Sequence, residues 1–153
     1  MPRLRNATRL AVTAAVVLST ACGGSPSEPE AELRAWVAEA EEAAENRDRG
    51  ALLDKIATSY ADARGNNRNE LGNMFRIYML RQQSIALLTK IDEIELLDDT
   101  AADLSLTIGM AGTGAGRFGL NADAYRFELE LEKDGDDWLL IGARWGEVGG
   151  EVR

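Results

Sequence analysis

Tyr125–Trp145 reads YRFELELEKDGDDWLLIGARW and is the stretch that decides the fold. In its first half apolar residues alternate with charged ones, which is typical of a strand with one buried face. Asp134-Gly135 is a common turn pair. The residues from Trp138 to Trp145 are therefore expected to return as the next antiparallel strand, and the stretch predicts a β-hairpin.

The alternation in this hairpin also predicts a register for its two strands, because one face must collect the apolar side chains. The expected pairs are Leu131 with Leu139, Leu129 with Ile141, Phe127 with Ala143 and Tyr125 with Trp145. Trp138 and Leu140 would then lie on the opposite face, among glutamates. Apolar side chains on a charged face need a cover, which could be a loop or a partner subunit. Trp138 and Leu140 are therefore a candidate surface for a protein partner or for a homodimer.

Two further stretches before this hairpin have the pattern of strands. Leu104–Met110 alternates apolar residues with small ones. In residues 84–97 the apolar residues are odd-numbered early and even-numbered late. A strand changes phase only through an extra residue, so we expect a β-bulge near Asp92-Glu93 that bends the sheet.

Helical spacing of apolar residues characterises the part of the chain that precedes these strands. It predicts helices over about 31–46, 49–63 and 68–82. Ser27 and Asn67 each stand three residues before a glutamate, the spacing of a capping box. Helices followed by antiparallel strands predict a single α+β domain.

The element order, the helix LGNMFRIYML (residues 71–80) and the strand WLLIGARW (residues 138–145) together resemble the nuclear transport factor two-like (cystatin-like) superfamily. The resemblance covers residues 31–147. It implies an α+β cone in which three N-terminal helices pack on a bent four-stranded antiparallel meander. Typical members place a short strand between the second and third helices. Gly65-Asn66-Asn67 leaves no room for one, so we expect the cone without it.

The beginning of the chain resembles the signal peptide of a bacterial lipoprotein. Arg3, Arg5 and Arg9 precede the apolar run 10–18, which is too short to span a bilayer. Ser19-Thr20-Ala21 then leads into Cys22, the chain's one cysteine. This resembles a lipobox, with Ser19 where leucine is usual.

The lipobox resemblance implies cleavage before Cys22 and acyl chains on that residue. The protein would then be a lipid-anchored lipoprotein of the cell envelope that faces the periplasm. If the host is Gram-negative, Gly23 after the cysteine favours the outer membrane. The alternative is a secreted protein, cut at the same place, with a free thiol on Cys22. The expected organisation is a signal peptide (1–21), a flexible tether (22–30), the α+β domain (31–147) and a C-terminal tail (148–153).

Charge and composition bear on several classes of function. The chain has 26 acidic residues, 17 basic residues and a net charge of −9. Removal of residues 1–21 takes away three arginines and leaves −12. Such a charge repels nucleic-acid phosphates and anionic lipid headgroups. The chain has no histidine, which excludes histidine triads and histidine metal sites. We expect no nucleic acid, metal or cofactor.

Two motifs in the second half are weak. Residues 114–119 match G-x-G-x-x-G, but a dinucleotide site needs this motif to open a helix, and here a strand is expected to follow. Asp134, Asp136 and Asp137 lack the remaining ligands of a calcium loop. A loop and a polar hairpin are sufficient explanations.

The resemblance also implies a pocket inside the cone. Enzymes of the superfamily, such as ketosteroid isomerases and dehydratases, use an aspartate with tyrosine or histidine in an apolar cavity. Asp62 and Asp123 are the candidate aspartates, but they match no catalytic motif and we assign no catalytic residue. The candidate pocket for a small apolar ligand consists of Tyr60, Tyr78, Tyr125 and Trp145. The alternative for each is packing in the core.

These observations predict a membrane-tethered binding or interaction module. Two alternatives remain open from the sequence. One is an envelope assembly or structural factor, and the other is a pocket enzyme of the isomerase or dehydratase type.

Overall fold

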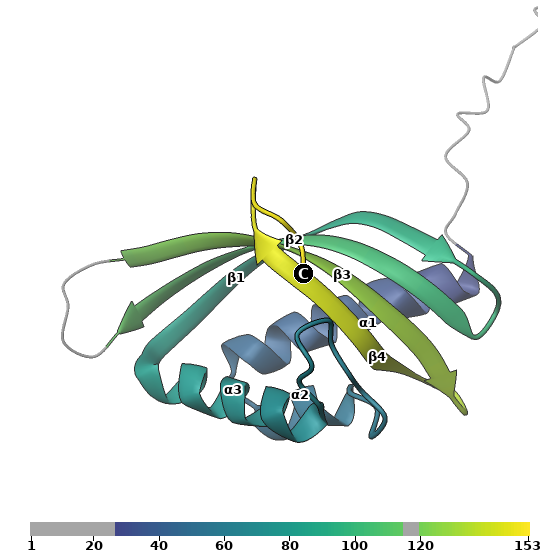
Figure 1. Ribbon diagram of the computed structural model, residues 1–153, viewed down its shortest axis with the longest axis horizontal. Coiled ribbons are helices and arrows are strands. Elements are labelled where there is room, and N and C mark those ends of the chain that lie inside the picture. Colours follow the sequence, from purple (N-terminus) through teal and green to yellow (C-terminus); the bar gives the residue numbers. More distant parts are fainter. Residues whose placement is uncertain (1–26, 115–119) are drawn as a thin grey trace, which may run out of the picture.

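The computed structural model describes residues 27–114 and 120–153, in which helices come first and strands follow (Figure 1). The helices lie on one side of a curved sheet, as expected for the α+β cone. Among the described residues, no helix is both long and apolar enough to cross a membrane. The elements are α1 (Glu28–Glu45), α2 (Arg49–Asp54), α3 (Arg68–Arg81), β1 (Gln82–Leu96), β2 (Ala101–Gly114), β3 (Leu120–Asp134) and β4 (Asp137–Glu147).

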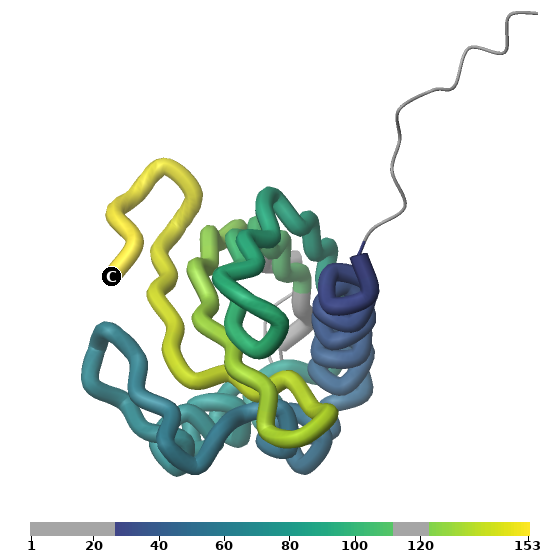
Figure 2. The backbone as a smooth tube through the Cα atoms, turned by 90° about the vertical axis from the view of Figure 1, so that its right-hand side faces the viewer, coloured from purple at the N-terminus to yellow at the C-terminus, as the bar shows by residue number. Residues whose placement is uncertain are grey.

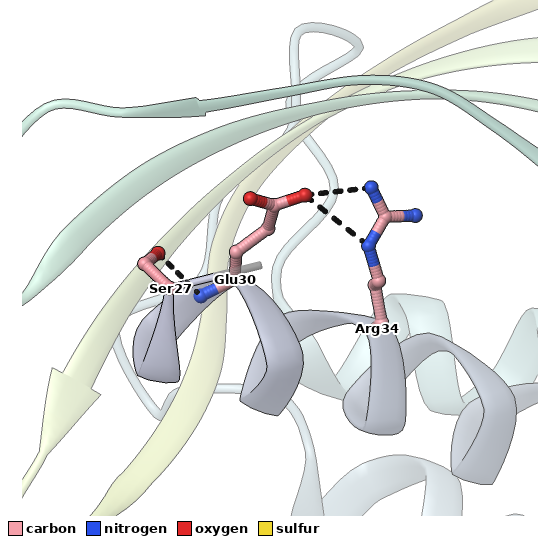
Figure 3. A network of polar contacts seen from close by, with 3 residues as sticks. All are labelled: Ser27, Glu30 and Arg34. Carbon is pink, nitrogen blue, oxygen red and sulfur yellow. Dashed lines mark hydrogen bonds and ion pairs between the residues drawn. The ribbon is translucent and has the colours of Figure 1, made fainter. Parts of the chain in front are cut away.

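The two long helices begin at the residues that the capping pattern predicts. The Ser27 hydroxyl accepts a hydrogen bond from the Glu30 backbone N–H at 3.4 Å, and the Glu30 carboxylate pairs with Arg34 one turn later at 2.7 Å (Figure 3). Asn67 and Glu70 form a complete capping box at the start of α3. Both caps satisfy N–H groups that a helix end otherwise leaves without partners.

The predicted second helix is shorter than expected, because its C-terminal half pairs with a strand. α2 ends at Asp54. Residues 55–63 then run beside β4 (Figure 2), where the Leu140 N–H donates to the Lys55 carbonyl at 2.9 Å and the Ala63 N–H donates to the Ala143 carbonyl at 3.1 Å. Ile56 forms a parallel bridge with Leu140. This segment therefore covers one edge of β4 without becoming a regular strand.

The residues after β4 cover the rest of the same edge. The chain turns back after Glu147, and Trp145 and Arg153 exchange two backbone hydrogen bonds of 3.0 and 3.3 Å. The predicted C-terminal tail is thus joined to the sheet.

The sheet is an antiparallel meander in the order β1-β2-β3-β4, as predicted. The register between β1 and β2 shifts between Ile91 and Glu93, which confirms the predicted bulge near Asp92-Glu93. A bulge increases twist and bends the strand. The bend lets the sheet curve over the helices.

The predicted register of the β3–β4 hairpin is wrong. Leu131 pairs with Leu140 and Phe127 pairs with Trp145, because Ile141 is an extra residue between the partners of Glu130 and Leu131. Because of the extra residue, the side chains of Trp138 and Leu140 before it lie on the same face of the sheet as those of Ala143 and Trp145 after it. This face packs on the core. Trp138 is 5 % exposed and Leu140 is 8 % exposed, so they are core residues and not the predicted partner surface.

The core is best packed at the end of the cone near the β3–β4 turn. Leu33 from α1, Leu104 from β2 and Leu131 from β3 are almost completely buried there. Toward the other end, Ile108, Phe127 and Trp145 pack on the core but stay half-buried. The end that holds these half-buried side chains is therefore less completely packed than the end near the β3–β4 turn.

Candidate functional site

The less completely packed end of the cone carries a group of aromatic side chains, which we call the mouth. It consists of Tyr78 on α3, Tyr125 and Phe127 on β3, and Trp145 on β4. The β3 side chains share a face because they are two residues apart. Trp145 lies on the same face because it pairs with Phe127 in the observed register.

The three aromatic rings on the strands form a continuous row. The centroids of Tyr125 and Phe127 are 6.5 Å apart, and those of Phe127 and Trp145 are 6.4 Å apart with an interplanar angle of 20°. These distances lie in the range of favourable aromatic pairs. Tyr125 is tilted by 54° to Phe127, so within the row it is the pair of Phe127 and Trp145 that offers a flat apolar ligand nearly parallel rings.

Tyr78 and Asp123 supply polar groups to the mouth. Burial raises the pKa of Tyr78, and the nearby charge of Asp123 and then Tyr125 raise it further. Tyr78 is 37 % exposed, so its hydroxyl remains within reach of solvent or a ligand. The mouth thus combines a phenol, which can donate a hydrogen bond, with the carboxyl group of Asp123, whose charge acts on it.

Tyr60 does not belong to this group, although the sequence placed it in the same candidate pocket. It is 2 % exposed, and its hydroxyl donates to the Asp62 carboxylate at 3.4 Å. The same carboxylate accepts from the backbone N–H groups of Arg64 at 2.9 Å and Asn66 at 2.8 Å. Burial, followed by the charge of Asp62, raises the pKa of Tyr60 far above its ordinary value. Tyr60 and Asp62 organise the loop before α3 and are not available to a ligand.

Arg64 also belongs to this region, although no sequence pattern singles it out. Its guanidinium lies 4.4 Å from the centroid of the Trp145 ring and donates to the Trp145 carbonyl at 2.9 Å. This cation–π contact holds the ring in place. Arg64 is far from Trp145 in the sequence, so only the fold brings them together.

A hollow with a volume of about 600 Å³ lies away from the mouth, between α1, α2 and the β3–β4 turn. Lys55 pairs with Glu39 at 2.6 Å, and Lys133 pairs with Glu32 at 2.6 Å. The Trp138 indole N–H also donates to Glu32 at 2.9 Å. These polar groups satisfy one another across three elements, so we interpret them as a structural clamp between α1 and the rest of the domain.

Several predicted features lie outside the described residues. They include Cys22, the signal segment 1–21, the tether up to residue 26, and residues 115–119 of the G-x-G-x-x-G match. The elements on both sides of that match are β2 and β3, so the helix that a dinucleotide site requires does not follow it. In the described part of the chain, no group of acidic or cysteine side chains is arranged to hold a metal ion.

Comparison with solved structures identifies the fold. A protein from Novosphingobium aromaticivorans named for scytalone dehydratase superposes with a TM-score of 0.71 at 7 % identity, over 80 % of this chain and 85 % of that one. A protein of Streptomyces avermitilis, named as a dehydratase of the NTF2-like family, gives 0.69 at 12 % identity, over 80 % and 98 %. A ketosteroid isomerase-like protein from Erwinia carotovora atroseptica gives 0.66 at 13 % identity, over 79 % and 97 %.

These likenesses show that the chain has the nuclear transport factor two-like fold. No family model matches its sequence, and no curated protein matches it by sequence. At such low identities a shared fold does not carry a shared activity. The function has to be argued from the side chains of this chain.

Proposed function

We propose that the protein is a lipid-anchored protein of the cell envelope whose mouth binds a small ligand with an apolar or aromatic body. The half-buried row of Tyr125, Phe127 and Trp145 carries this proposal. Apolar surface left in water is unfavourable by about 25 cal/mol per Å². A ligand that covers the row would recover this free energy.

The chemistry of the mouth also indicates the kind of ligand. Binding pockets are mostly apolar, with a few polar groups that fix the orientation of the ligand. In the mouth these groups are the Tyr78 hydroxyl and the Asp123 carboxylate. We therefore expect a flat apolar body that carries a hydroxyl or amino group, which would donate to Asp123.

The anchor is supported by the sequence around Cys22. The described body begins with the cap Ser27, five residues after that cysteine. At about 3.5 Å per residue, five extended residues reach about 17 Å. An acylated Cys22 would therefore hold the end of the cone near the β3–β4 turn close to a membrane, with the mouth at the opposite end of the domain.

A fluorescence titration with N-phenyl-1-naphthylamine, a neutral apolar dye, tests the binding site. We expect Tyr78→Ala to weaken dye binding at least fivefold, because it removes one wall of the mouth. Leu88→Ala is the matched control, since Leu88 is an exposed apolar residue on β1, outside the mouth. The proposal fails if the folded protein does not bind the dye, or if both variants weaken binding equally.

The intact mass of the membrane-extracted protein tests the anchor separately. We expect a chain that begins at Cys22 and carries acyl groups. A Cys22→Ser variant should leave the detergent phase. A bare thiol on Cys22 in a protein that remains in aqueous buffer would contradict the anchor and leave the binding site untouched.

A pocket enzyme of the isomerase or dehydratase type is the second candidate. The presence of Tyr78 and Asp123 in the mouth favours it, because a phenol and a carboxyl group can each donate and accept protons. Native mass spectrometry of the purified protein would identify a retained ligand. Conversion of that ligand by the wild type, but not by Asp123→Asn, would favour the enzyme over the binding module.

A further inference from the structure

The outer side of α3 and the α1–α2 connection carry arginines that form no ion pair with any acid of the described residues. We call this surface the arginine face and define it by Arg47, Arg49, Arg76 and Arg81, together with the exposed Ile77 and Leu80. The net charge of the whole chain is −9. Three of these arginines line one hollow and Arg81 lies in the last turn of the same helix α3, so basic side chains are concentrated here on an acidic chain.

The geometry of the arginine face leaves its charge available. The Arg47 guanidinium donates to the Met79 carbonyl at 2.8 Å, and the Arg49 guanidinium donates to the Gly72 carbonyl at 2.8 Å. Both arginines are thus held by neutral acceptors. Among the described residues, the ion pairs found involve other cations. A hollow of about 370 Å³ lies here, and its lining of Asn46, Arg47, Arg49, Arg76, Met79 and Leu80 includes no carboxylate.

Two acidic side chains lie next to this face, and each accepts a hydrogen bond from a neutral backbone N–H. The Asp48 carboxylate caps α2 by accepting from the Ala51 N–H at 2.9 Å. The Glu45 carboxylate accepts from the Leu87 N–H at 2.8 Å. Charges farther away than about 8 Å are largely screened at physiological salt. Both carboxylates keep their negative charge, but the hollow itself is lined by guanidinium groups and by no carboxylate.

Apolar side chains stand beside these arginines on the same helix. Leu80 is 71 % exposed, Ile77 is 43 % exposed and Met74 is 42 % exposed. They are three residues apart, so they form one stripe along α3. A small anion or a nucleic-acid backbone would leave this stripe in water. A phospholipid surface satisfies both kinds of group, with phosphates for the arginines and acyl chains for the stripe.

We propose that the arginine face docks the domain onto a bilayer that contains anionic phospholipids. Guanidinium groups bind phosphate in a forked geometry, and exposed leucine and isoleucine side chains insert between the headgroups. The sequence predicts that the net negative charge of the chain repels anionic lipid headgroups. Binding of one face to a bilayer depends instead on the charge of that face. The proposal depends neither on acylated Cys22 nor on ligand binding at the mouth.

Vesicle co-sedimentation of a chain that begins at Gly23 tests the proposal. The buried apolar residues of the described part lie between Leu33 and Ala143, so this chain keeps the core and loses the apolar leader. We expect it to bind vesicles of phosphatidylglycerol with phosphatidylcholine more tightly than vesicles of phosphatidylcholine alone, and less tightly as salt rises. Failure to bind the anionic vesicles would overturn the proposal.

Two charge variants locate the binding surface. Each arginine near an anionic surface accounts for about a fivefold change in affinity, so Arg76→Gln with Arg81→Gln should weaken binding about 25-fold. Arg126→Gln with Arg144→Gln changes the net charge equally on the strands β3 and β4 and should have little effect. Equal losses in both pairs would show a general charge effect and contradict a docking face.

An apolar variant separates a bilayer from a soluble anion. Leu80→Asn should weaken vesicle binding about tenfold, because it removes an inserting side chain. Leu88→Asn, at a similarly exposed position on β1, is the control and should not weaken it. If Leu80→Asn has no effect and inorganic phosphate displaces the protein from the vesicles, the face binds a free anion and the bilayer proposal is wrong.

Discussion

Asp62 should be among the polar residues on which the stability of the domain depends most. It is 7 % exposed, and its two oxygens accept from the backbone of Arg64 and Asn66, from the Asn66 side chain, and from the Tyr60 hydroxyl. Asp62→Ala would leave the buried Tyr60 hydroxyl without this acceptor, which is unfavourable by about 1–3 kcal/mol. It would also remove the acceptor of two backbone N–H groups in the loop. We expect a total loss on the order of 3 kcal/mol in the free energy of unfolding.

Urea unfolding followed by tryptophan fluorescence measures this loss, and Asp62→Asn is the matched control. The asparagine keeps one oxygen for the backbone N–H groups of Arg64 and Asn66, so we expect it to lose only about 1 kcal/mol. Tyr60→Phe removes a long hydrogen bond of 3.4 Å and should be milder still. The reasoning is refuted if Asp62→Ala loses less than about 1 kcal/mol, or if the asparagine and alanine variants are equally unstable.

Three further predictions concern the core, the clamp and the mouth. Leu33→Ala should lower the free energy of unfolding by about 3 kcal/mol in thermal or urea unfolding, because Leu33 is fully buried. Hydrogen bonds from Lys133 and then from Trp138 lower the pKa of Glu32, so its contribution to stability is present above its ordinary pKa of 4.5 and is lost as the pH falls through the lowered value. The difference in urea midpoint between wild type and Glu32→Gln should therefore shrink in acid, and a constant difference would contradict the clamp. The pKa of Tyr78 is raised, so ultraviolet titration should show a tyrosine that ionises above pH 10, and this transition should be absent in Tyr78→Phe. Asp123→Asn should lower the pKa of Tyr78, because it removes a nearby negative charge.

The features that could be predicted from the sequence are those that depend on residues close together in the chain. The capping pattern at Asn67 and the phase change near Asp92-Glu93 each depend on neighbouring residues, and both are confirmed. The second helix was predicted too long because its apolar spacing also suits a segment packed on β4. There the backbone of residues 55–63 bonds to the strand instead of to itself.

The β3–β4 register could not be derived from periodicity. Trp138, Leu139, Leu140 and Ile141 are all apolar, so either face of β4 could have been the buried one. Only the extra residue at Ile141 decides between them. Because of this error, Trp138 and Leu140 were predicted to form a partner surface, although they lie in the core.

The candidate site was predicted in part, because aromatic identity is visible in a sequence and spatial grouping is not. Tyr78 and Tyr125 lie near each other, whereas Tyr60 belongs to a structural loop. Arg64 and the arginine face were missed for the same reason. Both are assembled from segments that are distant in the chain. The net charge of the whole chain does not show where its basic side chains gather.

The covered edge of β4 determines how far the sheet could grow. One side of β4 is paired with β3, and the other with residues 55–63 and with Arg153. β1 is the remaining edge among the described strands, and it is paired only with β2. A filament built by strand addition needs two open edges on every subunit. If copies of this domain ever join through their sheets, the growth would therefore stop at a closed pair.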